Sequence, residues 1–228
     1  MGKILGLLTV KNEVDIIQRM LDANGRFMDF VVVDNGSTDG TYEIVKGHKS
    51  VLESIVDTTP YNENTLTKVL FAMADKYQAE WYFEIDADEI IDDSFADFIL
   101  PALPVNCVTS KIYYCLPDER VYKTYNYWQR LYRNPGLQKA VADADTEIQK
   151  LHMGKMPIPR AERVFVHSQI PIRHYQVRSY EQGMKKYQQY LTLDSALSFQ
   201  PKGYEHLKKL AESIKTGDYS KFSIKGGR

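Results

Sequence analysis

Cysteine is scarce in this sequence, which contains only Cys107 and Cys115. The two lie eight residues apart and belong to no C-x-x-C or Cys/His pattern. This spacing argues against a disulfide scaffold and against a structural zinc site. We therefore expect a fold held by its hydrophobic core, in a reducing compartment.

Long hydrophobic runs are also lacking. The apolar stretch at residues 4–10 is too short to span a bilayer, has no small-residue cleavage site and leads directly into Lys11-Asn12-Glu13. It predicts a first strand and not a signal peptide. We expect a cytoplasmic protein, with peripheral contact to a membrane as an alternative.

An excess of either charge is absent, because 29 Lys and Arg residues balance 30 Asp and Glu residues. This balance argues against nucleic acid or an acidic polymer as a partner. The length fits one domain, expected at residues 1–214 and divided into halves at 1–100 and 101–214. The segment 215–228 is expected to be a mobile basic tail that could touch anionic lipid. No feature indicates the oligomeric state.

In the first half of the chain, strand patterns alternate with amphipathic helix patterns. The expected strands are 4–10, 30–33, 52–56 and 81–85, and the expected helices are 13–24, 41–49 and 65–77. Such alternation predicts an α/β fold with a mostly parallel sheet flanked by helices on both faces.

The second half has a different pattern. Strands are expected at 107–115, 127–132, 164–167 and 172–174, a turn at 117–120, loops at 141–147 and 153–160, and helices at 180–193 and 204–214. This predicts a loop-rich half that ends in C-terminal helices.

Three polar clusters follow predicted strands, at residues 9–13, 34–41 and 84–89. In an open parallel sheet, ligands bind outside the carboxyl ends of the strands, so the three clusters predict one site. The second cluster has more polar side chains than a turn needs, and its carboxylates could accept hydrogen bonds from a base or a ribose. A purely structural role, with Asp39 or Thr41 capping a helix, stays open.

The third cluster contains Asp86-Ala87-Asp88. In an extended segment Asp86 and Asp88 point the same way and Ala87 points back. Adjacent carboxylates repel unless a cation or proton lies between them, and hard oxygen ligands suit Mg²⁺, Mn²⁺ or Ca²⁺. The alternative is an acidic helix N-terminus, to which we assign Glu89, Asp92 and Asp93.

Taken together, Val10-Lys11-Asn12-Glu13, Val33–Thr41 and Glu84–Glu89 resemble the family 2 glycosyltransferases over about the first hundred residues. The resemblance implies a GT-A fold, a nucleotide diphosphate sugar donor (UDP-sugar favoured) and Mn²⁺ or Mg²⁺. The implied nucleotide-sugar-binding residues are Val10, Asn12, Glu13, Asp34, Asn35, Ser37, Asp39, Lys68, Asp86, Ala87 and Arg178. The implied metal ligands are Asp86, Asp88 and His174.

Residues 128–133, 166–168 and 172–180 resemble later segments of related proteins. From these we assign Trp128, Arg130 and His167 to the donor or acceptor sugar, with His167 also the rival of His174 at the metal. The family implies inverting transfer of a hexose to a glycan, lipid-linked or other hydroxyl acceptor, as in polysaccharide biosynthesis. The candidate bases are Asp143, Asp145 and Glu147, with Asp118 and Glu119 as alternatives.

Two other functions compete with this hypothesis. A non-catalytic nucleotide-sugar-binding protein could use a degenerate GT-A scaffold. An Asp-x-Asp phosphatase is the second, although its motif follows the first strand, and here the motif follows the fourth. Sugar nucleotidyltransferases need a Gly- and Arg-rich first loop, which residues 10–13 do not form.

Overall fold

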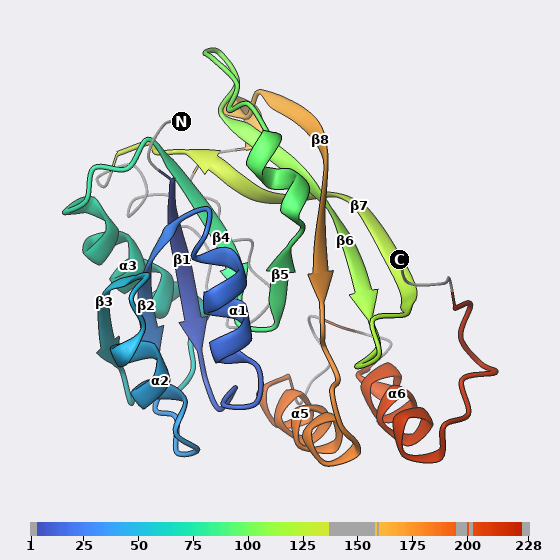
Figure 1. The fold of residues 1–228 in the computed structure, drawn as a ribbon. Helices are drawn as coiled ribbons and strands as arrows, with labels where there is room; N and C mark the ends of the chain where they lie inside the picture. The colour runs from blue at the N-terminus through green and yellow to red at the C-terminus, as the bar shows by residue number, and fades with distance from the viewer. Residues whose placement is uncertain (1–3, 137–157, 159, 195–199, 201–202, 225–228) are drawn as a thin grey trace. The chain divides into compact units, whose positions relative to one another are not determined.

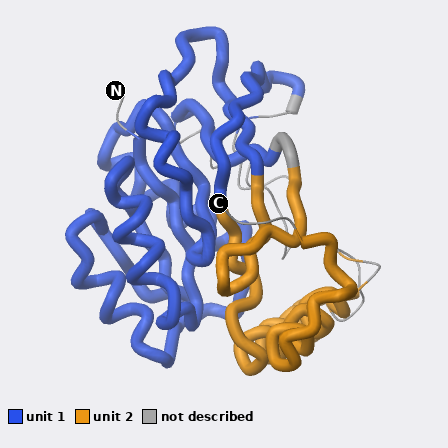
Figure 2. Tube along the Cα trace, turned by 45° about the vertical axis from the view of Figure 1, so that its right-hand side comes forward, with its two compact units in different colours: residues 1–111, 126–172 blue, residues 112–125, 173–228 orange. Residues whose placement is uncertain are grey.

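The computed structural model describes residues 4–136, 158, 160–194, 200 and 203–224. The chain forms two compact units (Figure 2): unit 1 contains Met1–Lys111 and Asn126–Ile172, and unit 2 contains Ile112–Tyr125 and Arg173–Arg228. The division does not fall at residue 100, where the sequence suggested two halves, because 101–111 and 126–172 cluster with the first hundred residues.

Unit 1 holds an α/β sandwich (Figure 1). Its elements are β1 (Ile4–Val10), α1 (Ile17–Asn24), β2 (Asp29–Asp34), α2 (Thr41–Gly47), β3 (Val51–Val56), α3 (Glu63–Asp75), β4 (Trp81–Asp86), β5 (Glu89–Ile91) and the short 3₁₀ helices η1 (Asp93–Asp97) and η2 (Arg160–Glu162). Three strands pass from one unit into the other: β6 (Cys107–Cys115), β7 (Val121–Arg133) and β8 (Phe165–His174).

The strands form one sheet in the order β3-β2-β1-β4-β7-β6-β8-β5. β1 pairs in parallel with β2 and β4, β2 pairs in parallel with β3, and β4 pairs antiparallel with β7. The prediction of a mostly parallel sheet flanked by helices is confirmed.

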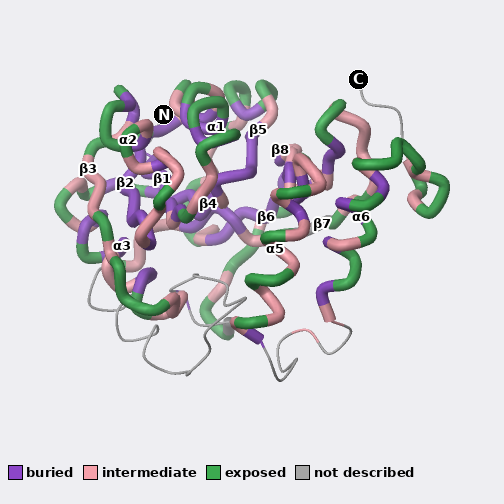
Figure 3. Tube along the Cα trace, turned by 90° about the horizontal axis from the view of Figure 1, so that it is seen from below, coloured by how far each residue is buried: buried purple, intermediate pink, exposed green. Residues whose placement is uncertain are grey.

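Both faces of the parallel strands are covered, with α1 and α2 on one side and α3 on the other (Figures 1 and 3). Successive strand side chains point to opposite faces, so Leu5 and Leu7 of β1 pack with Val31 and Val33 of β2 against α3. Each fully buried side chain of this kind stabilises the fold by about 1.5–3 kcal/mol. Burial on both faces explains why these strands are continuously apolar.

Two element boundaries differ from the sequence prediction. α1 begins at Ile17 and not at residue 13, since the backbone N–H groups of Glu13 and Val14 donate to side chains of another loop. Residues 164–167 and 172–174 belong to one strand, β8. Pro171 interrupts the apolar pattern but keeps its carbonyl, which accepts a hydrogen bond from Asp92 N at 3.0 Å.

Unit 2 contains α5 (Tyr180–Leu193) and α6 (Glu205–Thr216), which confirm the two predicted C-terminal helices. Its core consists of Leu116, Val177, Tyr204, Leu207, Leu210 and Ala211. Gly183 allows α5 to approach α6, because a Cβ there would lie 2.7 Å from the Ala211 Cβ.

Part of the segment that was expected to be a mobile tail is packed against unit 2 in the structure. α6 continues to Thr216, and Tyr219, Phe222 and Ile224 pack against the unit 2 core. These apolar side chains recur within a polar segment, which is a weak indication of packing. The lysines of the same segment indicate an exposed tail instead. Residues 225–228 lie outside the described part of the chain.

Cys107 and Cys115 are both buried and unpaired. Burial raises the pKa of each thiol to about 11, so both stay protonated near neutral pH. Within the described residues, no helix combines the length and apolar character that crossing a bilayer requires.

Candidate functional site at the carboxyl ends of the parallel strands

The three polar clusters lie at one edge of the unit 1 sheet. Val10 at the end of β1 is level with Asp34 of β2, and Thr9 is level with Asp86 of β4. Neighbouring strands lie about 4.8 Å apart, so the ends of β2 and β4, on either side of β1, are about 10 Å apart. The strand topology therefore brings the predicted clusters together, as expected.

Residues 10–14 follow β1 and residues 34–41 include the end of β2 and the loop after it. We call these two segments the β1–β2 loop pair, and hydrogen bonds join them. Asn12 N–H donates to Ser37 Oγ at 2.9 Å, and Thr38 N–H donates to Asn12 Oδ1 at 2.9 Å. Asn12 has a φ of 56°, in the left-handed region that asparagine tolerates better than most residues. Asn12 and Ser37, both predicted to bind the nucleotide sugar, thus have structural roles.

Asp39 is the second anchor of the β1–β2 loop pair. Its carboxylate accepts hydrogen bonds from Val14 N at 3.2 Å, from Thr41 N at 3.0 Å and from Thr41 Oγ1 at 2.6 Å. Burial alone would raise the pKa of Asp39, but these hydrogen bonds outweigh it and hold the pKa below the ordinary 3.8. Asp39 therefore has a structural role at the start of α2, although the N-cap residue of that helix is Gly40 and not Asp39 or Thr41.

Asp34 differs from its neighbours in the loop pair. Its Oδ1 accepts from Ser37 N at 2.6 Å, whereas its Oδ2 is buried and has no hydrogen-bond partner among the described residues. A buried carboxylate oxygen without a donor costs free energy, and an N–H group of a ligand would remove that cost. Asn35, in contrast, donates to the carbonyls of Asp57 and Thr59.

Three carboxylates surround one guanidinium at the end of β4. Arg130 of β7 lies 3.7 Å from Glu84 and 2.8 Å from Asp86 and forms a short ion pair with Glu89. We name Glu84, Asp86, Glu89 and Arg130 the carboxylate cluster. Arg130 is only 5% exposed and Glu89 is fully buried. The sequence analysis assigned Arg130 to binding of the donor or acceptor sugar. In the structure its guanidinium contacts three carboxylates.

The environment of Arg130 keeps it charged. Burial alone would lower its pKa, but Glu89, Asp86 and Glu84 together shift the pKa above the ordinary value. Trp128 of β7 lies beside it, with the ring centroid 5.6 Å from the guanidinium carbon. Trp128 is 43% exposed and so remains available to a ligand.

The geometry of the Asp-x-Asp segment differs from the prediction. Ala87 and Asp88 form a turn between β4 and β5, so strand alternation does not extend to Asp88. The Asp86 side chain is 41% exposed, whereas Asp88 is 3% exposed. The assignment of Glu89 to a helix N-terminus is wrong, because it starts β5 and accepts a hydrogen bond from Asp86 N at 3.1 Å.

The predicted metal ligands are divided between the units. Asp86 and Asp88 belong to unit 1, and His174 belongs to unit 2, where its ring centroid lies 4.7 Å from that of Tyr114. Among the described residues, no group of three or more His, Cys, Asp or Glu side chains is arranged to hold a metal. The carboxylates of Asp86, at the end of β4, and of Asp88, in the turn that follows, nevertheless suit a hard divalent cation whose other ligands are water and diphosphate.

The remaining predicted residues are dispersed. Lys68 is half-buried on α3. His167 of β8 is exposed, and its Nδ1 lies 3.0 Å from Thr109 Oγ1. Arg178 of unit 2 donates to the carbonyl of Tyr175 at 3.1 Å. Among the alternative bases, Asp118 forms an ion pair with Arg120 at 2.7 Å. The preferred bases Asp143, Asp145 and Glu147 lie outside the described residues.

Sequence reasoning missed the roles of Glu84 and Glu89. A signal existed, since Glu84 interrupts the apolar run Trp81–Ile85 and Arg130 interrupts a second strand pattern. Buried charges require partners, so two such interruptions of opposite sign predict an ion pair. The antiparallel register, in which Phe83 pairs with Leu131, brings them opposite each other one step further along.

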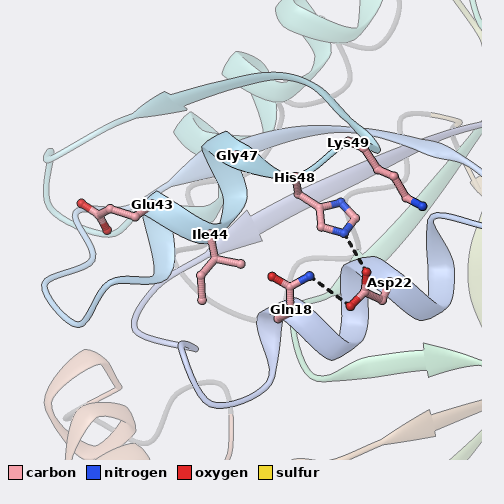
Figure 4. Close-up of a pocket in the computed structure, with 7 residues that line it drawn as sticks. All are labelled: Gln18, Asp22, Glu43, Ile44, Gly47, His48 and Lys49. Carbon is pink, nitrogen blue, oxygen red and sulfur yellow. Dashed lines mark hydrogen bonds and ion pairs between the residues drawn. The ribbon is translucent and has the colours of Figure 1, made fainter.

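A separate hollow of about 400 Å³ lies on α1 and α2 (Figure 4). In it His48 Nε2 lies 3.1 Å from Asp22, and His48 Nδ1 accepts from Ser50 N at 3.3 Å. His48 directly follows α2 and Asp22 lies on α1, so this contact links the two helices. No residue of the loop pair's hydrogen-bond network or of the carboxylate cluster lines this hollow.

Polar loops at the carboxyl ends of β1, β2 and β4 lie where open α/β sheets bind their ligands. The sequence profile of Glycosyl transferase family 2 matches residues 7–156, which is more than half of the chain. The chain belongs to glycosyl transferase family 2. No curated protein matches it.

Solved structures agree on the fold. The mannosyltransferase PcManGT from Pyrobaculum calidifontis, in complex with GDP-Man and Mn²⁺, is 14% identical with a TM-score of 0.56, and the match covers 95% of this chain and 74% of that one. S. aureus TarS 1–349, in complex with UDP-GlcNAc, is 14% identical with a TM-score of 0.54, and the match covers 96% and 73%. The predicted GT-A fold is confirmed. Family and fold together support glycosyl transfer from a nucleotide sugar.

Proposed function

We propose that the protein is a metal-dependent, inverting hexosyltransferase that uses a nucleotide diphosphate sugar, with UDP-sugar favoured. One observation carries this proposal. The unsatisfied Asp34 oxygen and the half-exposed Asp86 carboxylate lie at one sheet edge, two strands apart. A spacing of about 10 Å suits a ligand with a hydrogen-bond donor at one end and a diphosphate at the other.

In this proposal Asp34 accepts an N–H of the base, and the β1–β2 loop pair surrounds the nucleoside. Asp86 and Asp88 hold Mn²⁺ or Mg²⁺, with His174 and Arg178 as further ligand and phosphate contact. When bound, the cation stabilises the negative charge that grows on the leaving diphosphate. The neighbour complexes with GDP-Man and Mn²⁺ and with UDP-GlcNAc support the donor class, but they contain different bases.

The acceptor half of the proposal concerns later residues. Trp128 and His167 contact the donor or acceptor sugar, and one of Asp143, Asp145 and Glu147 removes the proton from the acceptor hydroxyl. A base on the face opposite the leaving group inverts the anomeric centre. The proposed acceptor is a glycan, a lipid-linked sugar or another hydroxyl. A cytoplasmic location, with residues 215–228 near anionic lipid, belongs to the same proposal.

The first test is a thermal-shift screen of UDP-sugars and GDP-sugars, each with and without Mn²⁺. A ligand that binds only the folded protein raises the melting temperature by mass action. We expect one nucleotide class to give a metal-dependent shift that Asp88→Ala abolishes and Asp34→Asn weakens. Asp93→Asn is the matched control, because the Asp93 side chain is 81% exposed and forms an ion pair with Arg26 at the surface.

Product analysis completes the test. We expect proton NMR of the product to show an anomeric configuration opposite to that of the donor. Retained configuration would refute inversion while leaving transfer intact. Nucleotide affinity without turnover on any acceptor would instead support a non-catalytic binding protein, and no shift with any donor would remove the proposed donor site.

A further inference from the structure

Arg130 and Glu89 close a ring around the β4–β5 turn, which consists of Ala87 and Asp88. One guanidinium nitrogen of Arg130 contacts Asp86 Oδ2 at 2.8 Å and also contacts Glu89 Oε1. Glu89 Oε2 accepts the backbone N–H of Asp86 at 3.1 Å. The two residues that flank the turn are therefore joined through a side chain from a different strand, β7.

The ring determines how Asp86 presents its carboxylate. Asp86 and Glu89 carry like charges three residues apart, and Arg130 provides the opposite charge between them. Without Arg130 the two carboxylates would repel, and Asp86, whose side chain is 41% exposed, would turn toward solvent. The guanidinium is suited to this role because it contacts several carboxylates from one planar group, which a lysine ammonium does not reproduce.

We propose that Arg130 and Glu89 are positioning residues, which hold Asp86 and the β4–β5 turn in the arrangement that receives a divalent cation and the donor diphosphate. The inference rests on the proposed function. Arg130 contacts the Asp86 carboxylate and Glu89 accepts the Asp86 backbone N–H, so both residues would act through Asp86.

A positioning role should affect metal affinity and metal-free nucleotide affinity differently. The β1–β2 loop pair is held by its own hydrogen bonds, so a change at Arg130 should leave metal-free nucleotide binding unaltered. Loss of a residue that orients a metal ligand typically weakens metal affinity by about 10–100-fold. A merely structural residue would instead change both affinities together or neither.

The experiment compares Arg130→Lys and Glu89→Gln with the native protein. Electron paramagnetic resonance titration measures Mn²⁺ affinity in the presence of UDP or GDP, and calorimetry with EDTA measures metal-free affinity for the same nucleotide. We expect Mn²⁺ affinity to fall by about 10–100-fold and metal-free affinity to change by less than about two-fold. Arg133→Lys is the matched control, since Arg133 lies on the same strand and pairs with Glu80.

Each outcome bears on one claim. If the native protein binds no Mn²⁺ with either nucleotide, the proposed function fails. If it does bind, and folded Arg130→Lys and Glu89→Gln retain native Mn²⁺ affinity, the positioning role is overturned. Should neither variant fold, hydrogen exchange of the native protein decides, because a preformed ring protects the Asp86 amide before metal is added. Exchange at the rate of an exposed amide would refute the ring.

Discussion

The β1–β2 loop pair and the carboxylate cluster form two ends of one candidate site, and they are stabilised in different ways. In the loop pair, backbone N–H groups donate to Ser37, Asp39 and Asn12 side chains on facing loops. In the carboxylate cluster, a guanidinium from β7 satisfies three acidic residues at the end of β4 and the start of β5.

The two regions differ in how much stability is lost when one residue is replaced. The hydrogen bonds of the loop pair are numerous and partly exposed, so each contributes about 0.5–1.5 kcal/mol, or up to about 3 when one partner is charged. In the carboxylate cluster, one buried guanidinium contacts three carboxylates. Removing one partner of a buried ion network leaves uncompensated charge, which costs more than losing one exposed hydrogen bond.

The largest expected effect is therefore at Arg130. We expect Arg130→Met to lower the free energy of unfolding by about 3–5 kcal/mol, because Glu84 and Glu89, both buried, would lose the guanidinium that contacts them. Arg133→Met should cost less than half as much, since Arg133 is 20% exposed and its partner Glu80 is 49% exposed. Urea unfolding of both variants measures the difference. Equal losses would contradict the distinction between the two arginines.

A smaller effect is expected at Asp39. Asp39→Asn should cost about 1–2 kcal/mol at pH 6, because the amide nitrogen cannot accept the Val14 N–H that Oδ2 accepts. The folded pKa of Asp39 is depressed, so the carboxylate stabilises the fold above the unfolded pKa, and this contribution is lost as pH falls through the folded pKa. The difference between native and variant should thus shrink below about pH 4. Urea unfolding at pH 6 and pH 3 tests this, and a constant difference would argue against it.

Effects no larger than that of Asp39→Asn are expected at two glycines of α2, the N-cap residue Gly40 and the last helical residue Gly47. Gly40 has a φ of 97°, so Gly40→Ala should destabilise the protein by about 1–2 kcal/mol. Gly47→Ala should stabilise it by about 0.4–1 kcal/mol, since nothing lies within 4 Å of a Cβ there and its φ is not positive. Thermal unfolding compares the pair, and a stabilising Gly40→Ala would show that the loop pair tolerates another backbone conformation.

Features that depend on residues close together in the sequence could be predicted, whereas contacts between distant residues could not. Strand and helix patterns placed Ile4–Val10, Cys107–Cys115 and Tyr180–Leu193 at their observed bounds, because each depends on local periodicity. Consecutive polar residues after the strands likewise predicted the edge of the sheet at which the loops gather.

The carboxylate cluster could not be predicted in the same way. Arg130 meets Asp86 across 44 positions of sequence, through the pairing of β4 with β7. Since β4 ends at Asp86 and a turn follows at Ala87 and Asp88, the two-residue strand period does not extend through Asp88. Tyr219 and Phe222 pack against a core whose residues are distant in sequence. The basic composition of the segment gave no indication of this packing.

The chain has two tryptophans, and they differ in exposure: Trp81 is fully buried on β4, whereas Trp128 is 43% exposed beside Arg130. The protein therefore contains a built-in optical reporter. A soluble quencher reaches Trp128 and not Trp81, so the quenchable fraction of the native fluorescence isolates the residue next to the carboxylate cluster. Events at that end of the site can be followed spectroscopically without attaching a dye.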